Sequence, residues 1–165
     1  MKYLWVMRHA KSDRSIQGLS DFDRPLNLRG RKDSTRMGKW MRGLSNRPEM
    51  VISSPALRAR ETSERVAGFL GVTKQITWWD TLYPGQLKST LSQVKGLPRE
   101  ILAVLIVGHN PHLEDIVSYL SSDGYLDLTL STAAVALLES DTEDWEALPA
   151  LKARLRGIVS PKILG

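Results

Sequence analysis

The chain has 165 residues, of which 42% are hydrophobic and 25% are charged, a composition typical of a globular domain with a buried core. It contains no cysteine, which excludes disulfides, thiolate metal sites and a cysteine nucleophile. No apolar stretch approaches the roughly 20 residues of a membrane span, and the N-terminus lacks a signal-peptide pattern. We therefore expect one cytoplasmic domain over residues 1–165.

The net charge of +5 is unevenly distributed along the chain. Residues 1–65 carry 15 Lys and Arg against 7 Asp and Glu, whereas residues 66–165 carry 8 against 11. A basic region of this kind can attract phosphate, nucleic acid or an acidic protein. A simpler explanation for part of it is the solvated face of one helix, formed by Arg31, Lys32, Arg36, Lys39 and Arg42.

Apolar periodicity predicts strands that alternate with helices. In chain order we expect a strand at 2–7, a polar loop at 11–29, a helix at about 29–44, a strand at 50–52, a helix at about 55–70, a strand at 75–79, a helix at about 86–95, a strand at 101–107, a helix at 111–120 and a strand at 132–138. The run at 101–107 is continuously apolar, as expected of a central parallel strand. Ser54 is the expected N-cap of the helix that Pro55 begins.

This alternation predicts an α/β fold, a three-layer sandwich in which helices cover both faces of a mostly parallel sheet. Residues 145–148 are expected to pair with the strand at 132–138 as a hairpin and so to give the sheet an antiparallel edge. The pattern of residues 151–164 fits either a helix or an irregular edge.

Three of the expected strands end in polar residues suited to one chemistry. The first ends in Arg8 and His9, the second leads through Ser54 to Arg58, and the central one leads to His109. In a parallel sheet these ends share one rim, where α/β proteins bind ligands. Two arginines and a helix N-terminus suit a phosphoryl group.

A neutral histidine at such a rim can attack phosphorus and form a covalent phosphoryl-histidine, which water then hydrolyses. Any one of these residues alone is more simply explained as a packing or surface residue, but their independent assignment to one rim favours a site. We expect no cofactor and no metal. His109 and His112 are three residues apart, but no third ligand accompanies them.

Four segments resemble motifs of the histidine phosphatase superfamily, which has the phosphoglycerate-mutase-like fold. Residues 7–12 (MRHAKS) resemble its Arg-His-Gly signature, residues 53–62 (SSPALRARET) its second block, and residues 107–110 (VGHN) its second-histidine block. Residues 21–30 (DFDRPLNLRG) further resemble the loop of the small SixA-type phosphohistidine phosphatases. Three positions depart from the pattern, namely Ala10 for Gly, Lys11 where many relatives have Glu, and Glu61 for Gln.

The resemblance implies a role for each matching residue. His9 would be the phosphorylated nucleophile, and Arg8, Arg58 and His109 would bind and neutralise the phosphoryl group. Arg24 would lie at the mouth of the pocket, and we place Ser12 among the substrate-binding residues. In relatives that cleave phosphate monoesters, a carboxylic acid protonates the leaving group, and Asp80, with Tyr83 in the same loop, is only a loose match to it.

The bond cleaved is expected to be phosphorus–nitrogen, in phosphohistidine carried on a protein. Imidazole leaves far more easily than an alkoxide, because the pKa of its conjugate acid is about 6.5. The segment between residues 79 and 101 is also too short for the lid that larger relatives place over small sugar phosphates. Inorganic phosphate would be the product, and no membrane partner is expected.

Two alternatives remain open at this stage. One is an acid phosphatase or mutase that acts on a small phosphate monoester with Asp80 as the acid. The other is a non-catalytic module that binds phosphate or nucleic acid through the basic N-terminal region. No aromatic-plus-basic stacking pattern accompanies that region, which argues against nucleic acid.

Overall fold

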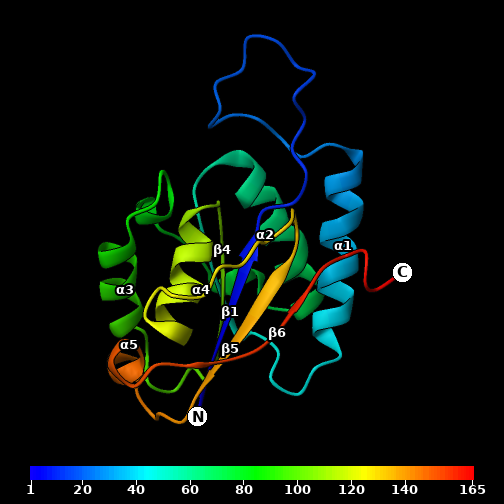
Figure 1. The fold of residues 1–165 in the computed structure, drawn as a ribbon. Coiled ribbons are helices and arrows are strands. Elements are labelled where there is room, and N and C mark those ends of the chain that lie inside the picture. Colours follow the sequence, from blue (N-terminus) through cyan, green and yellow to red (C-terminus); the bar gives the residue numbers. More distant parts are fainter.

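A mixed sheet of six strands forms the middle layer of the protein (Figure 1). The computed structural model describes the backbone of residues 1–165 and all side chains except those of residues 150 and 151. In spatial order the strands are β3 (Ile76–Trp78), β2 (Met50–Ser53), β4 (Ala103–Gly108), β1 (Lys2–Arg8), β5 (Val135–Ser140) and β6 (Arg154–Val159). The first four run parallel, and β5 and β6 add the antiparallel edge. The α/β fold class predicted from the sequence is confirmed.

Helices cover both faces of the sheet, as predicted. Helices α1 (Leu28–Arg42) and α2 (Leu57–Leu70) pack against each other on one face, and α3 (Leu87–Lys95) and α4 (His112–Ser122) lie on the other (Figure 1). Shorter elements are α5 (Leu148–Leu151) and 3-10 turns at Thr73–Gln75, Asp80–Leu82 and Trp145–Ala147. None of the helices in the described chain combines the length and apolarity that a membrane crossing requires.

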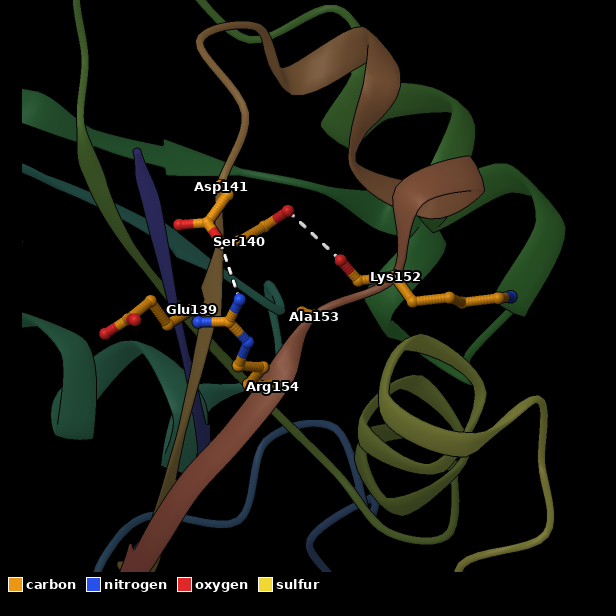
Figure 2. Close-up of a pocket in the computed structure, with 6 residues that line it drawn as sticks. All are labelled: Glu139, Ser140, Asp141, Lys152, Ala153 and Arg154. Atoms are coloured by element: carbon orange, nitrogen blue, oxygen red, sulfur yellow. Dashed lines mark hydrogen bonds and ion pairs between the residues drawn. The ribbon is translucent and has the colours of Figure 1, made fainter.

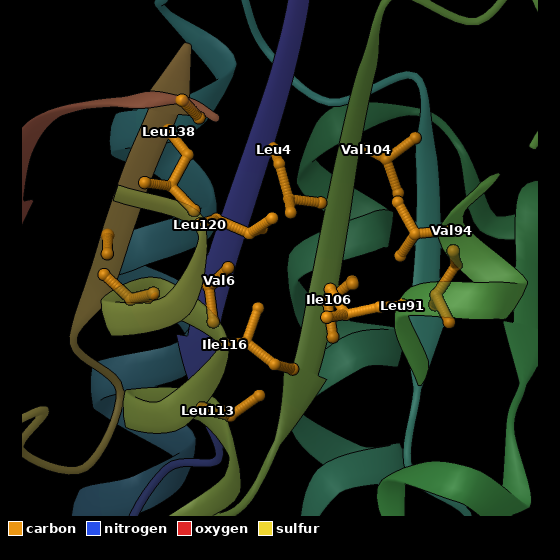
Figure 3. Close-up of a cluster of buried hydrophobic side chains, with 14 of the residues drawn as sticks. Leu4, Val6, Leu91, Val94, Val104, Ile106, Leu113, Ile116, Leu120 and Leu138 are labelled. Atoms are coloured by element: carbon orange, nitrogen blue, oxygen red, sulfur yellow. The ribbon is translucent and has the colours of Figure 1, made fainter. Parts of the chain in front are cut away.

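The strand β4 lies between β2 and β1 and is buried along its whole length. On the α3–α4 side, Val104 and Ile106 of β4 share one buried cluster with Leu91 and Val94 of α3 and with Ile116 of α4 (Figure 3). A second cluster on the other face packs β1 and β4 against α1 and α2. Burial of apolar surface on both faces explains why the run at 101–107 is continuously hydrophobic.

Helix α1 is held close to the loop that leaves β1. Asn27 caps the helix, because its side-chain oxygen accepts a hydrogen bond from the Gly30 amide at 2.8 Å. A Cβ on Gly30 would lie 2.1 Å from the Lys11 carbonyl oxygen, so only glycine fits there. The exit of β1 is thereby fixed against the start of α1.

Two local predictions are wrong. Residues 145–148 form helical turns instead of a strand, and the hairpin partner of β5 is β6, whose sequence pattern fits either a helix or an irregular edge. Helix α2 begins at Leu57 and is not capped by Ser54. The Ser54 hydroxyl accepts a hydrogen bond from the Ala56 amide at 3.2 Å, and it also contacts a histidine in the site described next.

Candidate active site

The ends of β1, β2 and β4 meet at one rim because the three strands are neighbours in register. Arg8 pairs with Gly108, so His9 and His109 both follow directly after this pair. Their ring centroids are 5.1 Å apart. The Ser54 amide donates to the Val107 carbonyl at 2.9 Å, which brings the start of α2 to the same place. The structure therefore gathers the two histidines with the residues that lead into Arg58.

The His9 ring is held in one tautomer. Its Nδ1 lies 2.7 Å from the Ala10 carbonyl oxygen, which can only accept, so Nδ1 carries the proton. Nε2 then carries the lone pair, which accepts a hydrogen bond from Nε of Arg58 at 3.3 Å. Burial, with smaller effects of the nearby His109 and Arg58, lowers the pKa of His9 to about 3 against the opposing effect of the Ala10 hydrogen bond. His9 is thus a neutral imidazole with an available nitrogen.

His109 is oriented by Ser54 and Arg58. Its Nδ1 lies 3.3 Å from a terminal nitrogen of Arg58, which can only donate, so Nδ1 accepts and Nε2 carries the proton. Nε2 lies 2.7 Å from the Ser54 hydroxyl, which accepts that proton. Burial, followed by the charge of Arg58, lowers the pKa of His109 to about 4.

Arg58 links both histidines to the loop that follows β1. Its side chain is only 6% exposed, and its remaining donors face Asp21. One terminal nitrogen donates to the Asp21 backbone carbonyl at 2.6 Å, and the other lies 3.0 Å from the Asp21 carboxylate. The guanidinium therefore faces the histidines on one edge and is held by Asp21 on another.

Asp21 joins three side chains at the mouth of the site. Besides Arg58, its carboxylate contacts Arg24 at 2.7 Å and accepts a hydrogen bond from the Tyr83 hydroxyl at 2.9 Å. Partial burial raises the pKa of Asp21, but the Tyr83 hydrogen bond and the charge of Arg58 outweigh it and lower the pKa overall. The Tyr83 ring lies 5.4 Å from the His109 ring. Sequence reasoning missed the part played by Asp21, whose only signal was its place in the loop resemblance.

A cavity of about 150 Å³ opens between these groups. Ser12 lines it and accepts a hydrogen bond from Arg24 at 3.1 Å. The lining residues are Arg8, His9, Lys11, Ser12, Arg14, Arg24, Arg58, His109, Asn110 and Thr132.

Arg8 is held at the wall of this cavity by the Leu130 carbonyl oxygen, to which it donates at 3.0 Å. Its Nε is buried and has no hydrogen-bond partner among the described residues. An unpaired buried donor costs free energy, and such groups are uncommon away from functional sites. The six residues proposed from the sequence as nucleophile or phosphate ligands thus lie around one cavity.

Two other residues considered from the sequence lie apart from it. Asp80 is exposed in a 3-10 turn and is absent from the cavity lining, although Tyr83 of the same loop reaches Asp21. His112 is buried and pairs with the Thr90 hydroxyl at 3.0 Å. Among the side chains that the structure describes, no group of three or more His, Cys, Asp or Glu is placed to hold a metal ion.

The departures from the family motifs are accommodated without strain. The Ala10 methyl packs in the core beside α2, and the Ala10 amide donates to the Thr62 hydroxyl at 3.0 Å. The Glu61 carboxylate accepts a hydrogen bond from the Leu26 amide at 2.6 Å and so ties α2 to the loop. Lys11 is exposed and lines the cavity. At the start of α2, the Leu57 amide donates to the Phe22 carbonyl at 2.9 Å and so ties the helix to the same loop.

A separate cavity of about 270 Å³ lies where the end of β5 meets the start of β6 (Figure 2). Its charged groups are paired with residues of the same region. Arg154 contacts Asp141 at 2.7 Å, and Lys152 contacts Asp123 at 2.6 Å. It offers no set of groups suited to the chemistry described above.

Comparisons with known proteins identify the class to which this fold and site belong. Residues 4–83 match the histidine phosphatase superfamily (branch 1). A chloroplastic protein of Arabidopsis thaliana is 30% identical over 173 residues, which cover 96% of this chain and 77% of the relative. The chain belongs to the histidine phosphatase superfamily.

More specific likenesses are to SixA proteins. The phosphohistidine phosphatase SixA of Escherichia coli is 29% identical over 156 residues, which cover 88% of this chain and 93% of that protein. A solved structure of the protein histidine phosphatase SixA, complexed with tungstate, superimposes with a TM-score of 0.85 at 25% identity and covers 99% of both chains.

Proposed function

We propose that this protein is a SixA-like, metal-independent phosphohistidine phosphatase, and that it works through a covalent phosphoryl intermediate on His9. The observation that carries the proposal is the unprotonated Nε2 of His9, which faces the guanidinium of Arg58 across a 3.3 Å hydrogen bond that an incoming phosphoryl group can replace. A nucleophile and a phosphate ligand thereby face the same small cavity. The likeness to SixA proteins, one of them solved with the oxyanion tungstate, supports the same assignment.

In the first step, His9 Nε2 attacks phosphorus, the P–Nε2 bond forms, and the bond from phosphorus to the substrate nitrogen breaks. The departing imidazole keeps the electron pair of that bond and leaves as a neutral ring when its other nitrogen carries a proton. Arg8 and Arg58 neutralise the charge on the equatorial oxygens, His109 lies against the same group, and Arg24 and Ser12 complete the binding site. In the second step, water attacks phosphorus, the P–Nε2 bond breaks, and inorganic phosphate leaves.

Support for a protein as the substrate comes from the loop that covers Arg58. Ile16, Leu19 and Phe22 of this loop are 47%, 44% and 38% exposed. The Phe22 ring packs edge-on against Tyr83, whose hydroxyl bonds to Asp21 beside Arg58, so an exposed apolar side chain lies at the mouth of the site. The small cavity admits a phosphoryl group, while the rest of the substrate would rest on this outer surface.

The experiment that tests the function compares substrates directly. A peptide that carries one phosphohistidine and a panel of phosphate monoesters are incubated with the protein in the presence of EDTA, and kcat/KM is measured for each. The proposal expects release of phosphate from the peptide at a rate well above that from every monoester. Faster hydrolysis of a monoester would favour a small-molecule phosphatase, and turnover that EDTA abolishes would overturn metal independence.

A further inference from the structure

A second cavity adjoins the candidate active site at Thr132. It has a volume of about 210 Å³, and Thr132 lines both cavities. It lies between α1, the loop before β5 and the C-terminal segment, which runs beside α1 in Figure 1. We call it the α1 cavity, and its lining is Arg29, Asp33, Arg36, Ser131, Thr132, Pro161 and Lys162.

The α1 cavity is cationic and accessible. Arg29 is 59% exposed and reaches Asp33 only at 3.5 Å. Arg36 donates to the Pro161 carbonyl at 3.3 Å, which turns this exposed guanidinium toward the cavity. Lys162 is exposed and forms no ion pair with the side chains that the structure describes. Three cations therefore face one carboxylate there.

The start of α1 carries charges that helix stability does not favour. The positive end of the helix dipole lies at its N-terminus, where acidic residues stabilise a helix and basic residues destabilise it. The first turn of α1 has no acidic residue, and Arg29, which lines the α1 cavity, lies near its start. This placement of charge suits an anion outside the helix better than it suits the helix itself.

Positive charge also exceeds what one phosphoryl group needs. The active-site cavity has five cationic side chains in its lining, with Asp21 beside two of them, and the α1 cavity adds three more with Asp33. A phosphoryl group carries at most two negative charges. The remaining positive potential favours further negative charge on whatever brings the phosphoryl group to the site.

We propose that the α1 cavity is a docking subsite for acidic side chains of the phosphorylated protein, close to the phosphohistidine. This inference rests on the function proposed above and adds the chemistry of the surface that the substrate presents. Arg36 and Lys162 pair with carboxylates of the substrate, while its phosphoryl group enters the neighbouring cavity. Nucleic acid, the other polyanion that such a groove can attract, is treated as a competing outcome.

The test uses two synthetic peptides of equal length, each with one phosphohistidine, flanked in one by glutamates and in the other by glutamines. The wild-type protein should favour the glutamate peptide in kcat/KM by about threefold to tenfold, as expected for two or three exposed ion pairs. The preference should shrink as salt is raised. The double variant Arg36→Glu/Lys162→Glu should lose or reverse the preference and should cleave the glutamine peptide at the wild-type rate.

The matched control is Lys74→Glu/Lys95→Glu, which makes the same change of charge at exposed positions at the opposite rim of the sheet. It should keep the wild-type preference. The subsite is overturned if the Arg36/Lys162 variant prefers the glutamate peptide as strongly as wild type does. It is also overturned if the control variant loses this preference to the same extent as the Arg36/Lys162 variant. Loss of DNA-duplex binding in the Arg36/Lys162 variant, with no peptide preference in wild type, would assign the groove to nucleic acid. Failure of wild type to cleave either peptide would instead contradict the proposed function.

Discussion

The Asp21 carboxylate lies 3.0 Å from the Arg58 guanidinium, on the same arginine whose Nε faces His9. The Asp21 carboxylate therefore lies beside Arg58, the arginine that we propose binds the phosphoryl group. Asp21 also contacts Arg24 and Tyr83, so it fixes the orientation of two arginines at once. It stabilises the arrangement of these cations and, by its charge, opposes a second anion.

Replacing Asp21 with Asn should tighten the binding of a phosphate-like dianion. The amide oxygen can still accept hydrogen bonds from the arginines, while the repulsion between the carboxylate and the dianion is removed. We expect the Kd for sulfate or vanadate to fall by about tenfold, in line with charge interactions at short range near a protein surface. Isothermal titration calorimetry measures it. Asp23→Asn, in the same loop but hydrogen-bonded to Ser20, is the control and should leave the Kd unchanged. Weaker binding in Asp21→Asn would show that orientation outweighs repulsion.

Asp80 should be dispensable for the cleavage of phosphorus–nitrogen bonds. It is exposed and does not line the cavity, so Asp80→Asn is expected to change kcat/KM for a phosphohistidine peptide by less than about twofold, as is usual for exposed surface positions. The same variant is assayed with p-nitrophenyl phosphate. Loss of monoester hydrolysis with intact peptide hydrolysis would identify Asp80 as an acid for monoesters and would revive the small-molecule alternative.

Ser54 should matter through His109. The Ser54 hydroxyl accepts a hydrogen bond from Nε2 of His109. The lone pair on Nδ1 of the same ring therefore faces Arg58. In Ser54→Ala the ring loses this partner and is held by Arg58 alone, and we expect kcat to fall by about tenfold or more, within the range typical of a lost positioning contact. Ser54→Thr keeps the hydroxyl and should restore most of the rate. Equal losses in both variants, with unchanged KM and pH profile, would point to packing instead of orientation of His109.

The two buried histidines should make stability depend on pH. Burial lowers the pKa of His9 to about 3 and that of His109 to about 4, whereas in the unfolded chain both titrate near 6.5. Below about pH 6.5 the unfolded chain binds protons that the folded protein excludes. The free energy of unfolding therefore decreases as the pH is lowered, until the pKa values of the folded protein are reached. Each histidine contributes about 1.4 kcal/mol per pH unit in that window.

Urea denaturation in phosphate-free buffers between about pH 4 and 6.5 measures this dependence. His9→Gln removes one of the two titrating groups, so its free energy of unfolding should fall less steeply than that of wild type. A variant that loses stability in parallel with wild type would contradict a neutral, buried His9.

Much of the fold follows from patterns local in the sequence. Strand β4 is buried on both faces, so its residues are continuously apolar. Helix α1 is buried on one face, so its apolar residues recur at helical spacing, and both patterns can be recognised in the sequence. The C-terminal region was predicted less well, because Trp145 owes its burial to tertiary contacts and β6 is an edge strand with three exposed residues in six. Nothing in its own sequence distinguishes that strand from other half-exposed segments.

The candidate site divides in the same way. His9 and His109 follow strands directly, and Arg58 lies in the first turn of the helix after β2, so the topology of a parallel sheet predicts that they meet. Asp21 lies in a long loop, and only the folded chain shows that it reaches Arg58 and Tyr83. Ser54 looked like a helix cap, since serine before proline favours that role, but its hydroxyl is also within reach of the His109 ring.

The central claim is that His9 Nε2 carries the phosphoryl group during turnover. The most direct measurement is to mix the protein with a ³²P-labelled phosphohistidine peptide, quench in alkali, where phosphohistidine survives, and locate the label by mass spectrometry. The account predicts label on His9 in wild type and none in His9→Asn, with a circular-dichroism spectrum that shows the variant still folded. Label on another residue, or full phosphatase activity in folded His9→Asn, would contradict it.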